Sequence, residues 1–227
     1  MSRTEHLPAA LPTSVAFSSG RPDQAPATPF ARSAGWLSLT AGALFLVAQA
    51  VMATFDQAMN LDTSQEPLFI AAKLVYLGGF VVLMFALIGV HGLQAQRAGR
   101  LGTVAFGVAI IGTMMLGGDL WFESFAVPWL AGGPGGQGLT SEPSLLMGLG
   151  AISSYLLFAA GWTLFGLAAL RARVFPTVIS LGVVVGGLLG SQALLAPWGV
   201  PLGLALAALG LWISATGRRS RRLARSW

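Results

Sequence analysis

The chain has 227 residues, of which 55% are hydrophobic and 9% charged, and it contains no cysteine. Soluble domains carry about 25% charged residues, so this composition excludes an ordinary water-soluble protein and predicts one embedded in a lipid bilayer. The lack of cysteine excludes disulfides and thiolate metal sites. The only histidines, His6 and His91, lie in a tail and at a helix end, which excludes a bis-histidine haem. We therefore expect neither a metal nor a cofactor.

The two ends of the chain differ from its middle. The first 32 residues are rich in proline, alanine, serine and threonine, and they lack an apolar run long enough for a signal peptide. Residues 1–32 are therefore predicted to be a disordered cytoplasmic tail. Residues 218–227 contain five arginines and predict a second, basic cytoplasmic tail. Between the tails we expect one transmembrane domain, residues 33–217.

Charged residues divide this domain into long apolar segments. A helix needs about 20 apolar residues to cross about 30 Å of hydrocarbon, and the segments are long enough for six such crossings. The predicted helices are residues 33–55, 68–91, 101–127, 144–170, 174–196 and 200–216. The predicted fold is an all-α, polytopic transmembrane bundle of six helices.

The basic residues predict the orientation of this bundle. Arginines occupy the first tail, the connections at 97–100 and 171–173, and the last tail, whereas the carboxylates Asp56, Asp62, Glu66 and Glu142 lie in the other two longer connections. Arginine-rich connections stay in the cytoplasm, so both termini are predicted to lie inside, in a multi-pass protein of the cell membrane. The net charge of +5 and the pI of 11.1 then anchor the topology, and we expect no nucleic-acid partner.

Two carboxyl groups lie within a predicted span. Asp119 and Glu123 are four residues apart and so project from one face of the third helix, with Asp119 the deeper. An ionisable residue inside a span costs about 2.5–3.5 kcal/mol, so its default interpretation is a functional site. A carboxyl group buried among apolar neighbours can stay protonated at neutral pH and act as a proton donor.

Other helices place polar and aromatic side chains at the same depth. We expect these side chains to converge with the two carboxyls on one cavity near the outer leaflet. The candidate catalytic residues are Asp119, Glu123 and Asp56, with Asp56 and Gln49 as a proton relay. The candidate substrate-binding residues are Trp121, Phe122, Phe125, Tyr155, Phe158, Trp162, Gln49, Lys73 and Tyr76.

Each of these residues also has a purely structural interpretation. Lys73 can pair with Asp119 as an ion pair between two helices. Glu123 and Asp56 can be interfacial residues without a function, and aromatic residues at helical spacing are more often packing than a binding site. The combination favours a pocket, because carboxyls, a lysine, a tyrosine and several aromatic rings are predicted at one depth.

An acid that faces a cavity lined by aromatic rings suits one kind of chemistry. It can protonate an alkene or epoxide, and the ring faces can then stabilise the resulting carbocation. A location in the bilayer suits a long isoprenoid that partitions into lipid. We therefore expect a lipophilic small molecule as the substrate.

Three segments carry a resemblance to known proteins: Gly-Gly-Asp-Leu-Trp-Phe-Glu-Ser-Phe-Ala-Val-Pro-Trp-Leu at 117–130, the helix over 155–165, and Arg-Ala-Arg-Val-Phe-Pro at 171–176. Over residues 35–217 the chain resembles a group of small actinobacterial integral membrane proteins. Some of these are similar to the membrane-bound terpene cyclases of drimentine-type pathways, which cyclise a farnesyl chain on an indole diketopiperazine. The resemblance implies proton-initiated cyclisation without a metal.

Two other classes of function remain open. One is a small permease or proton-coupled carrier, and the other is a non-enzymatic structural membrane subunit. A carrier predicts polar groups that continue to the cytoplasmic side, whereas the predicted cytoplasmic halves consist almost entirely of alanine, leucine, valine and glycine. The sequence does not predict an oligomeric state.

Overall fold

A computed structural model of the chain describes residues 29–55, 61–133 and 144–224, with the side chains of 33–55, 62–133 and 144–217. Within these ranges the chain forms helices joined by turns, and no strand is present there. Four of the helices are long and apolar enough to cross a membrane. The all-helical, membrane-type fold predicted from composition is therefore confirmed at this level.

The structure describes the following helices. In chain order they are α1 (Pro29–Met52), α2 (Leu61–Gln65), α3 (Pro67–Trp121), the π-helix η1 (Phe122–Ala126), α4 (Val127–Ala131), α6 (Leu145–Ala172), α7 (Thr177–Leu189), the 3₁₀-helix η2 (Gly190–Gln192) and α8 (Val200–Ala224). Two bounds differ from the prediction at the tails. α1 begins inside the predicted first tail, and α8 continues into the predicted second tail, because a helix backbone continues across polar residues where nothing breaks it.

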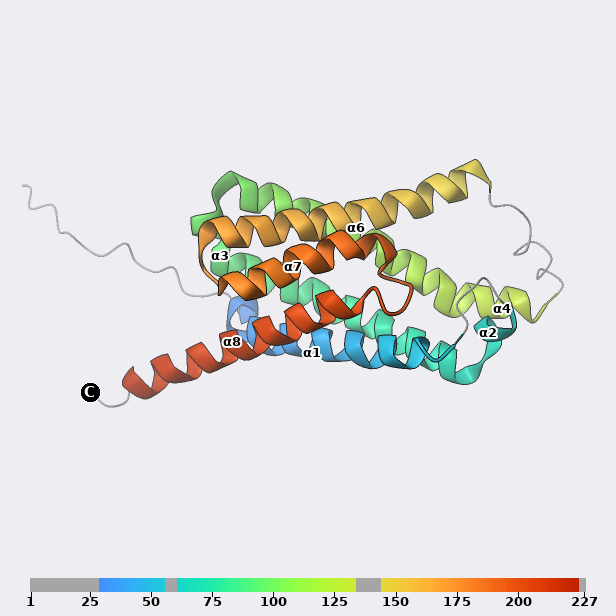
Figure 1. Cartoon of the computed structure of the whole chain (residues 1–227), viewed down its shortest axis with the longest axis horizontal. Helices are drawn as coiled ribbons and strands as arrows, with labels where there is room; N and C mark the ends of the chain where they lie inside the picture. The colour runs from blue at the N-terminus through green and yellow to red at the C-terminus, as the bar shows by residue number, and fades with distance from the viewer. Residues whose placement is uncertain (1–28, 56–60, 134–143, 225–227) are drawn as a thin grey trace, which may run out of the picture.

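α3 consists of two antiparallel arms, residues 67–98 and 100–121, joined at Gly99 (Figure 1). Gly99 has φ +57° and ψ −148°, a backbone conformation open to glycine and strained for other residues. The arms lie side by side, since the His91 and Phe106 rings stack with centroids 4.2 Å apart. The sequence analysis predicted a connection over 92–100, whereas the structure continues the helix to this single glycine.

The helices enclose a common core. α3 packs against α1 and α6, α8 packs against α1 and α7, and α6 packs against α7 (Figure 1). Glycines allow these contacts to be close: a Cβ atom at Gly112 would stand 2.4 Å from the backbone nitrogen of Phe158, and one at Gly210 would stand 2.4 Å from that of Leu39. Such small residues are what holds membrane helices together, because lipid supplies no hydrophobic drive between them.

α7 is shorter than predicted. The predicted helix spans 174–196, whereas the α-helix ends at Leu189, and η2 and a turn with a cis Ala196–Pro197 peptide lead to α8. Together α7 and η2 make up an apolar stretch, Thr177–Gln192, about 24 Å long at 1.5 Å per residue. The N-terminal half of α6 therefore extends past the end of α7 (Figure 1).

The two ends of the bundle differ in charge. At one end lie the α3 turn, the α6–α7 turn and the end of α8 (Figure 1). We call it the arginine end, after the exposed Arg97, Arg100, Arg171 and Arg173. α2, α4 and the start of α6 lie at the opposite end, which we call the far end.

Candidate functional site

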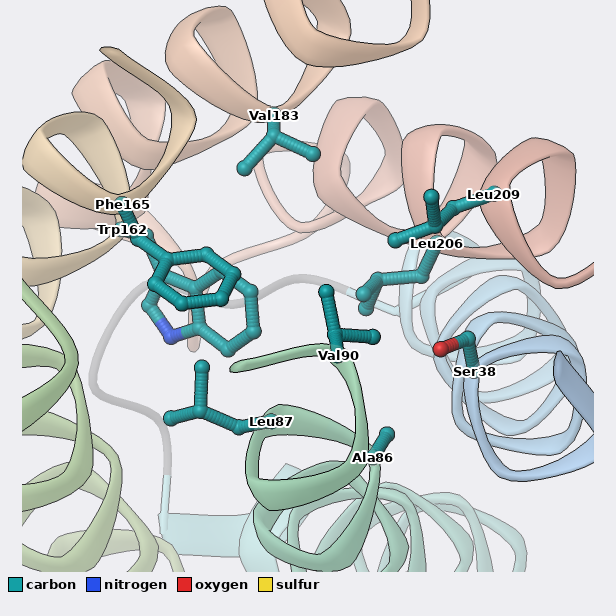
Figure 2. A pocket seen from close by; sticks show the side chains of 9 residues that line it. All are labelled: Ser38, Ala86, Leu87, Val90, Trp162, Phe165, Val183, Leu206 and Leu209. Carbon is teal, nitrogen blue, oxygen red and sulfur yellow. The ribbon is translucent and has the colours of Figure 1, made fainter. Parts of the chain in front are cut away.

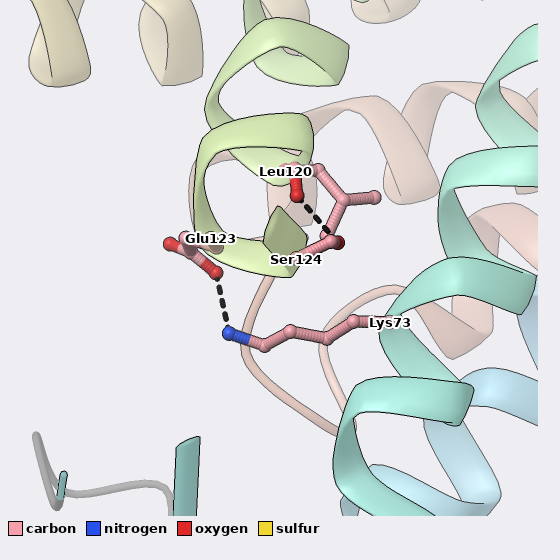
Figure 3. A network of polar contacts seen from close by, with 4 residues as sticks. All are labelled: Lys73, Leu120, Glu123 and Ser124. Carbon is pink, nitrogen blue, oxygen red and sulfur yellow. Dashed lines mark hydrogen bonds and ion pairs between the residues drawn. The ribbon is translucent and has the colours of Figure 1, made fainter. Parts of the chain in front are cut away.

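The helix that carries both carboxyls changes its geometry between them. α3 ends at Trp121 and continues as the π-helix η1, in which the backbone N–H of Val127 donates to the carbonyl of Phe122. The Ser124 hydroxyl donates to the Leu120 carbonyl at 2.6 Å (Figure 3). Short π-helices are rare and often occur at functional sites. The sequence analysis predicted a continuous α-helix over 101–127, since nothing in the residue types of 122–126 signals this change.

Glu123 forms an ion pair with Lys73 from the first arm of α3 (Figure 3). Lys73 Nζ lies 2.9 Å from Glu123 Oε2, with the side chains 12% and 34% exposed respectively. The ammonium group also lies 4.8 Å from the centre of the Phe69 ring. The structural alternative in the sequence analysis paired Lys73 with Asp119, whereas the structure gives Lys73 to Glu123.

Asp119 has a different environment. Its carboxyl group is partly buried and forms a hydrogen bond with the Ser154 hydroxyl of α6. The same hydroxyl donates to the Ala151 carbonyl at 2.7 Å. A serine hydroxyl has one proton, so it cannot donate to both acceptors at once. Both contacts are satisfied together when Asp119 is protonated and donates to Ser154. Ser154 is a site residue that the list of candidates missed, although the sequence analysis predicts the helix that carries it.

Tyr155 follows Ser154 directly on α6. It is partly buried on α6, within electrostatic range of both Asp119 and Glu123. Phe122 is partly buried at the start of η1. Trp121 and Phe125 point away from the core: they are 55% and 48% exposed, and their ring centroids lie 5.6 Å apart. Their rings therefore form an exposed surface of α3 and η1.

The remaining aromatic candidates of α6 lie in the packed core. Phe158 and Trp162 are buried, with ring centroids 6.2 Å apart. The Trp162 indole N–H donates to Thr113 Oγ1 at 3.0 Å, and Thr113 in turn donates to the Ala109 carbonyl at 2.6 Å. These contacts tie α6 to the second arm of α3. Both rings therefore lie inside the core rather than at the surface.

Gln49 and Tyr76 hold the connection between η2 and α8. Gln49 Nε2 and the Tyr76 hydroxyl both donate to the Ala193 carbonyl, at 2.9 Å and 2.7 Å. The backbone N–H of Gly199 donates to Gln49 Oε1 at 3.3 Å. Both side chains are fully buried. The structure thus places both side chains against the backbone of this turn rather than beside the carboxyls.

One small cavity lies nearer to the arginine end (Figure 2). Its volume is about 10 Å³, which is the room that one water molecule needs. Its walls are apolar except for one serine: Ser38, Ala86, Leu87, Val90, Trp162, Phe165, Val183, Leu206 and Leu209. Neither carboxyl lines it. The side chains that we expected to converge on one cavity are therefore divided, and Lys73, Asp119, Glu123 and Tyr155 remain together.

One further candidate residue, the search for metal sites and the comparisons complete the description. Asp56 lies outside the described residues. In the described part of the chain, no group of three or more histidine, cysteine, aspartate or glutamate residues is placed to hold a metal ion. Comparison of the chain with protein-family models, with curated proteins and with solved structures found no match.

Proposed function

We propose that the protein is a membrane-bound cyclase that protonates an isoprenoid chain, with Asp119 as the general acid. The observation that carries the proposal is the division between the two carboxyls. Glu123 forms an ion pair with Lys73 at 2.9 Å, while Asp119 contacts a neutral hydroxyl that already has an acceptor. One carboxyl is thus suited to give a proton and the other to take one.

The proton balance of the reaction follows from this division. Asp119 transfers its proton to a terminal alkene of the substrate, which leaves a carbocation in the chain. Ring closure moves the positive charge along the chain, and the Glu123 carboxylate then removes a proton to form a new alkene. Glu123 then releases this proton to water, and Asp119 takes up a proton from water, which resets the site. A farnesyl chain on an indole diketopiperazine is the substrate class that the resemblance implies.

The position of the site supports entry of the substrate from the bilayer. The small interior cavity does not have room for a farnesyl chain, so the chain would bind at the surface between η1 and α6. Tyr155 and Phe122 lie there, with Trp121 and Phe125 on the adjoining exposed face. These rings can stabilise a cation without acting as strong nucleophiles.

The test is cyclisation by purified protein in lipid, with a farnesylated indole diketopiperazine supplied in D₂O. We expect a cyclic isomer that carries one deuterium from the solvent. Asp119→Asn should lower the rate at least about 100-fold, the usual contribution of a general acid. Ser153→Ala is the matched control, because Ser153 bonds only the Gly150 carbonyl of its own helix. Wild-type activity in Asp119→Asn would contradict the assignment.

We also propose six membrane crossings with the arginine end in the cytoplasm. The support is the two-armed form of α3, the apolar stretch Thr177–Gln192 and the arginines gathered at one end. The chain has no cysteine, so single cysteines can report the topology. In intact cells a membrane-impermeant maleimide should label Gly133→Cys, and it should label Gln96→Cys only after permeabilisation, both positions being exposed. The reverse pattern would overturn the orientation.

A proton-coupled carrier is the second candidate. Ser38, Gln94 and Ser180 are buried in the half nearer the arginine end, and their polar side-chain atoms have no hydrogen-bond partner in the described part of the chain. That half is more polar than the sequence analysis assumed, and such atoms suit a hydrated path. If the protein is a carrier, Gln94→Leu should abolish substrate-driven proton flux into liposomes. If it is a cyclase, cyclisation should continue in the same variant.

A further inference from the structure

The interface between α6 and the second arm of α3 opens beyond Ser154. On the side toward the arginine end, Phe158 is buried and a Cβ atom at Gly161 would stand 2.5 Å from the Cα of Ala109. Toward the far end, Met147 is 53% exposed, and a Cβ atom at Gly150 would meet no heavy atom within 4 Å. Figure 1 shows the start of α6 and α4 well apart at the far end. Asp119 therefore lies where the two helices begin to separate, within reach of a molecule in the bilayer.

Among the residues that the structure describes, none is a cationic partner of Asp119. Lys73 is engaged by Glu123 and by the Phe69 ring, and the contact of Asp119 is the neutral Ser154 hydroxyl. Among the described residues of the half nearer the far end, the positive charge is that of Lys73, and the carboxyl groups number four: Asp62, Glu66, Asp119 and Glu123. The described arginines lie at the other end. An ionised Asp119 is therefore an uncompensated negative charge in a medium where such a charge is costly.

The surroundings select the kind of cation that would compensate it. Access is through lipid, which excludes a strongly hydrated ion and admits one that partitions into the bilayer. Tyr155 lies within electrostatic range of Asp119, and aromatic faces attract organic cations. Gly118 on α3 also leaves its surroundings open, because a Cβ atom there would meet nothing within 4 Å. Both helices thus leave room for a bulky apolar group beside the carboxylate.

We propose that Asp119 and Tyr155 form a binding site for lipophilic organic cations, such as a quaternary phosphonium or ammonium ion in the outer leaflet. The proposal concerns binding alone and does not depend on the cyclase reaction. The charged and titratable groups around Asp119 are Glu123 of η1, Lys73 of the first arm of α3 and Tyr155 of α6. The Asp119 carboxyl holds either a proton or the cation, so binding weakens as the pH falls.

The test measures binding of tetraphenylphosphonium to the full chain in nanodiscs by equilibrium dialysis, with tetraphenylborate as an anion of the same shape. We expect saturable binding of the phosphonium and only lipid partitioning of the borate. Asp119→Asn should weaken phosphonium binding at least tenfold, and Ser153→Ala should leave it unchanged. Equal affinity in Asp119→Asn, or equal saturable binding of the borate, would overturn the proposal.

A second variant is decisive if Asp119→Asn fails to fold. Lys73→Met releases Glu123 from its ion pair and adds a second uncompensated carboxylate beside the site. The affinity for tetraphenylphosphonium should then rise several-fold, and a thermal unfolding curve would verify that the variant is folded. Unchanged or weaker binding in folded Lys73→Met would overturn the proposal. Cyclisation activity is not measured in either experiment, so its absence has no bearing on the result.

Discussion

The interface between α3 and α6 has two halves that meet at the contact between Asp119 and Ser154. Toward the arginine end, Gly112 and Gly161 bring the two backbones together, and Phe158 and Trp162 fill the remaining space. Toward the far end the helices separate, and apolar side chains of α6 such as Leu146 and Met147 are exposed. The comparison teaches that the close-packed half fixes the position of the carboxyl while the open half leaves it accessible.

The largest expected effect comes from adding one methyl group to the close-packed half. In Gly112→Ala the new Cβ atom would stand 2.4 Å from the Phe158 backbone nitrogen, so the two helices must move apart. We expect a loss of about 3 kcal/mol in unfolding free energy. Gly150→Ala lies in the open half of the partner helix and should gain up to about 1 kcal/mol, because alanine favours a helix over glycine. Thermal unfolding in nanodiscs would measure both, and a loss of the same size in the two variants would remove the distinction between the halves.

A smaller effect is expected at the ion pair of the far half. Lys73→Met leaves Glu123 without its partner, which should cost about 2 kcal/mol, less than for a fully buried pair because Glu123 remains partly exposed. Lys73→Met combined with Glu123→Gln should recover most of that loss. The comparison of single and double variants by chemical denaturation isolates the pair. If the double variant is as unstable as the single one, the loss arises from the packing of the lysine side chain instead.

The smallest expected effect concerns two tryptophans on opposite sides of the division. Trp162→Phe removes the hydrogen bond to Thr113 in the close-packed half and should cost about 1 kcal/mol. Trp121→Phe changes an exposed ring and should stay within about 0.5 kcal/mol of the parent protein. Unfolding curves of the two variants provide the measurement. Equal losses would show that Trp121 makes a contact that stabilises the protein as much as the hydrogen bond between Trp162 and Thr113 does.

The sequence predicts the helices better than it predicts their contacts. Charges and apolar length locate the long helices, and the arginines at 97 and 100 mark the turn of α3, because a charge is costly within an apolar helix of this length. The division of the aromatic residues is less accessible. Trp121 and Phe125 face outward, whereas Phe158 and Trp162 face inward. The sequence does not predict this difference, because both faces of a helix in a bilayer are apolar and hydrophobicity does not distinguish them.

The candidate site shows the same difference. The cost of ionisable groups within a span singles out Asp119, Glu123 and Lys73 from the sequence. Which of them pair depends on how the helices rotate about their axes, and helical periodicity along one segment does not contain that rotation. The partnership of Lys73 with Glu123 and the role of Ser154 therefore emerge from the structure.

The π-helix η1 holds one residue more per hydrogen-bonded turn than an ordinary helix. In evolutionary terms it is equivalent to a single residue inserted into a regular helix. Deleting one residue from it would rotate everything that follows by about 100°, the angle between successive residues. Asp119 precedes the segment and would keep its place, while α4 would face a new direction. The segment thus allows the direction of α4 to change without moving the Asp119 carboxyl.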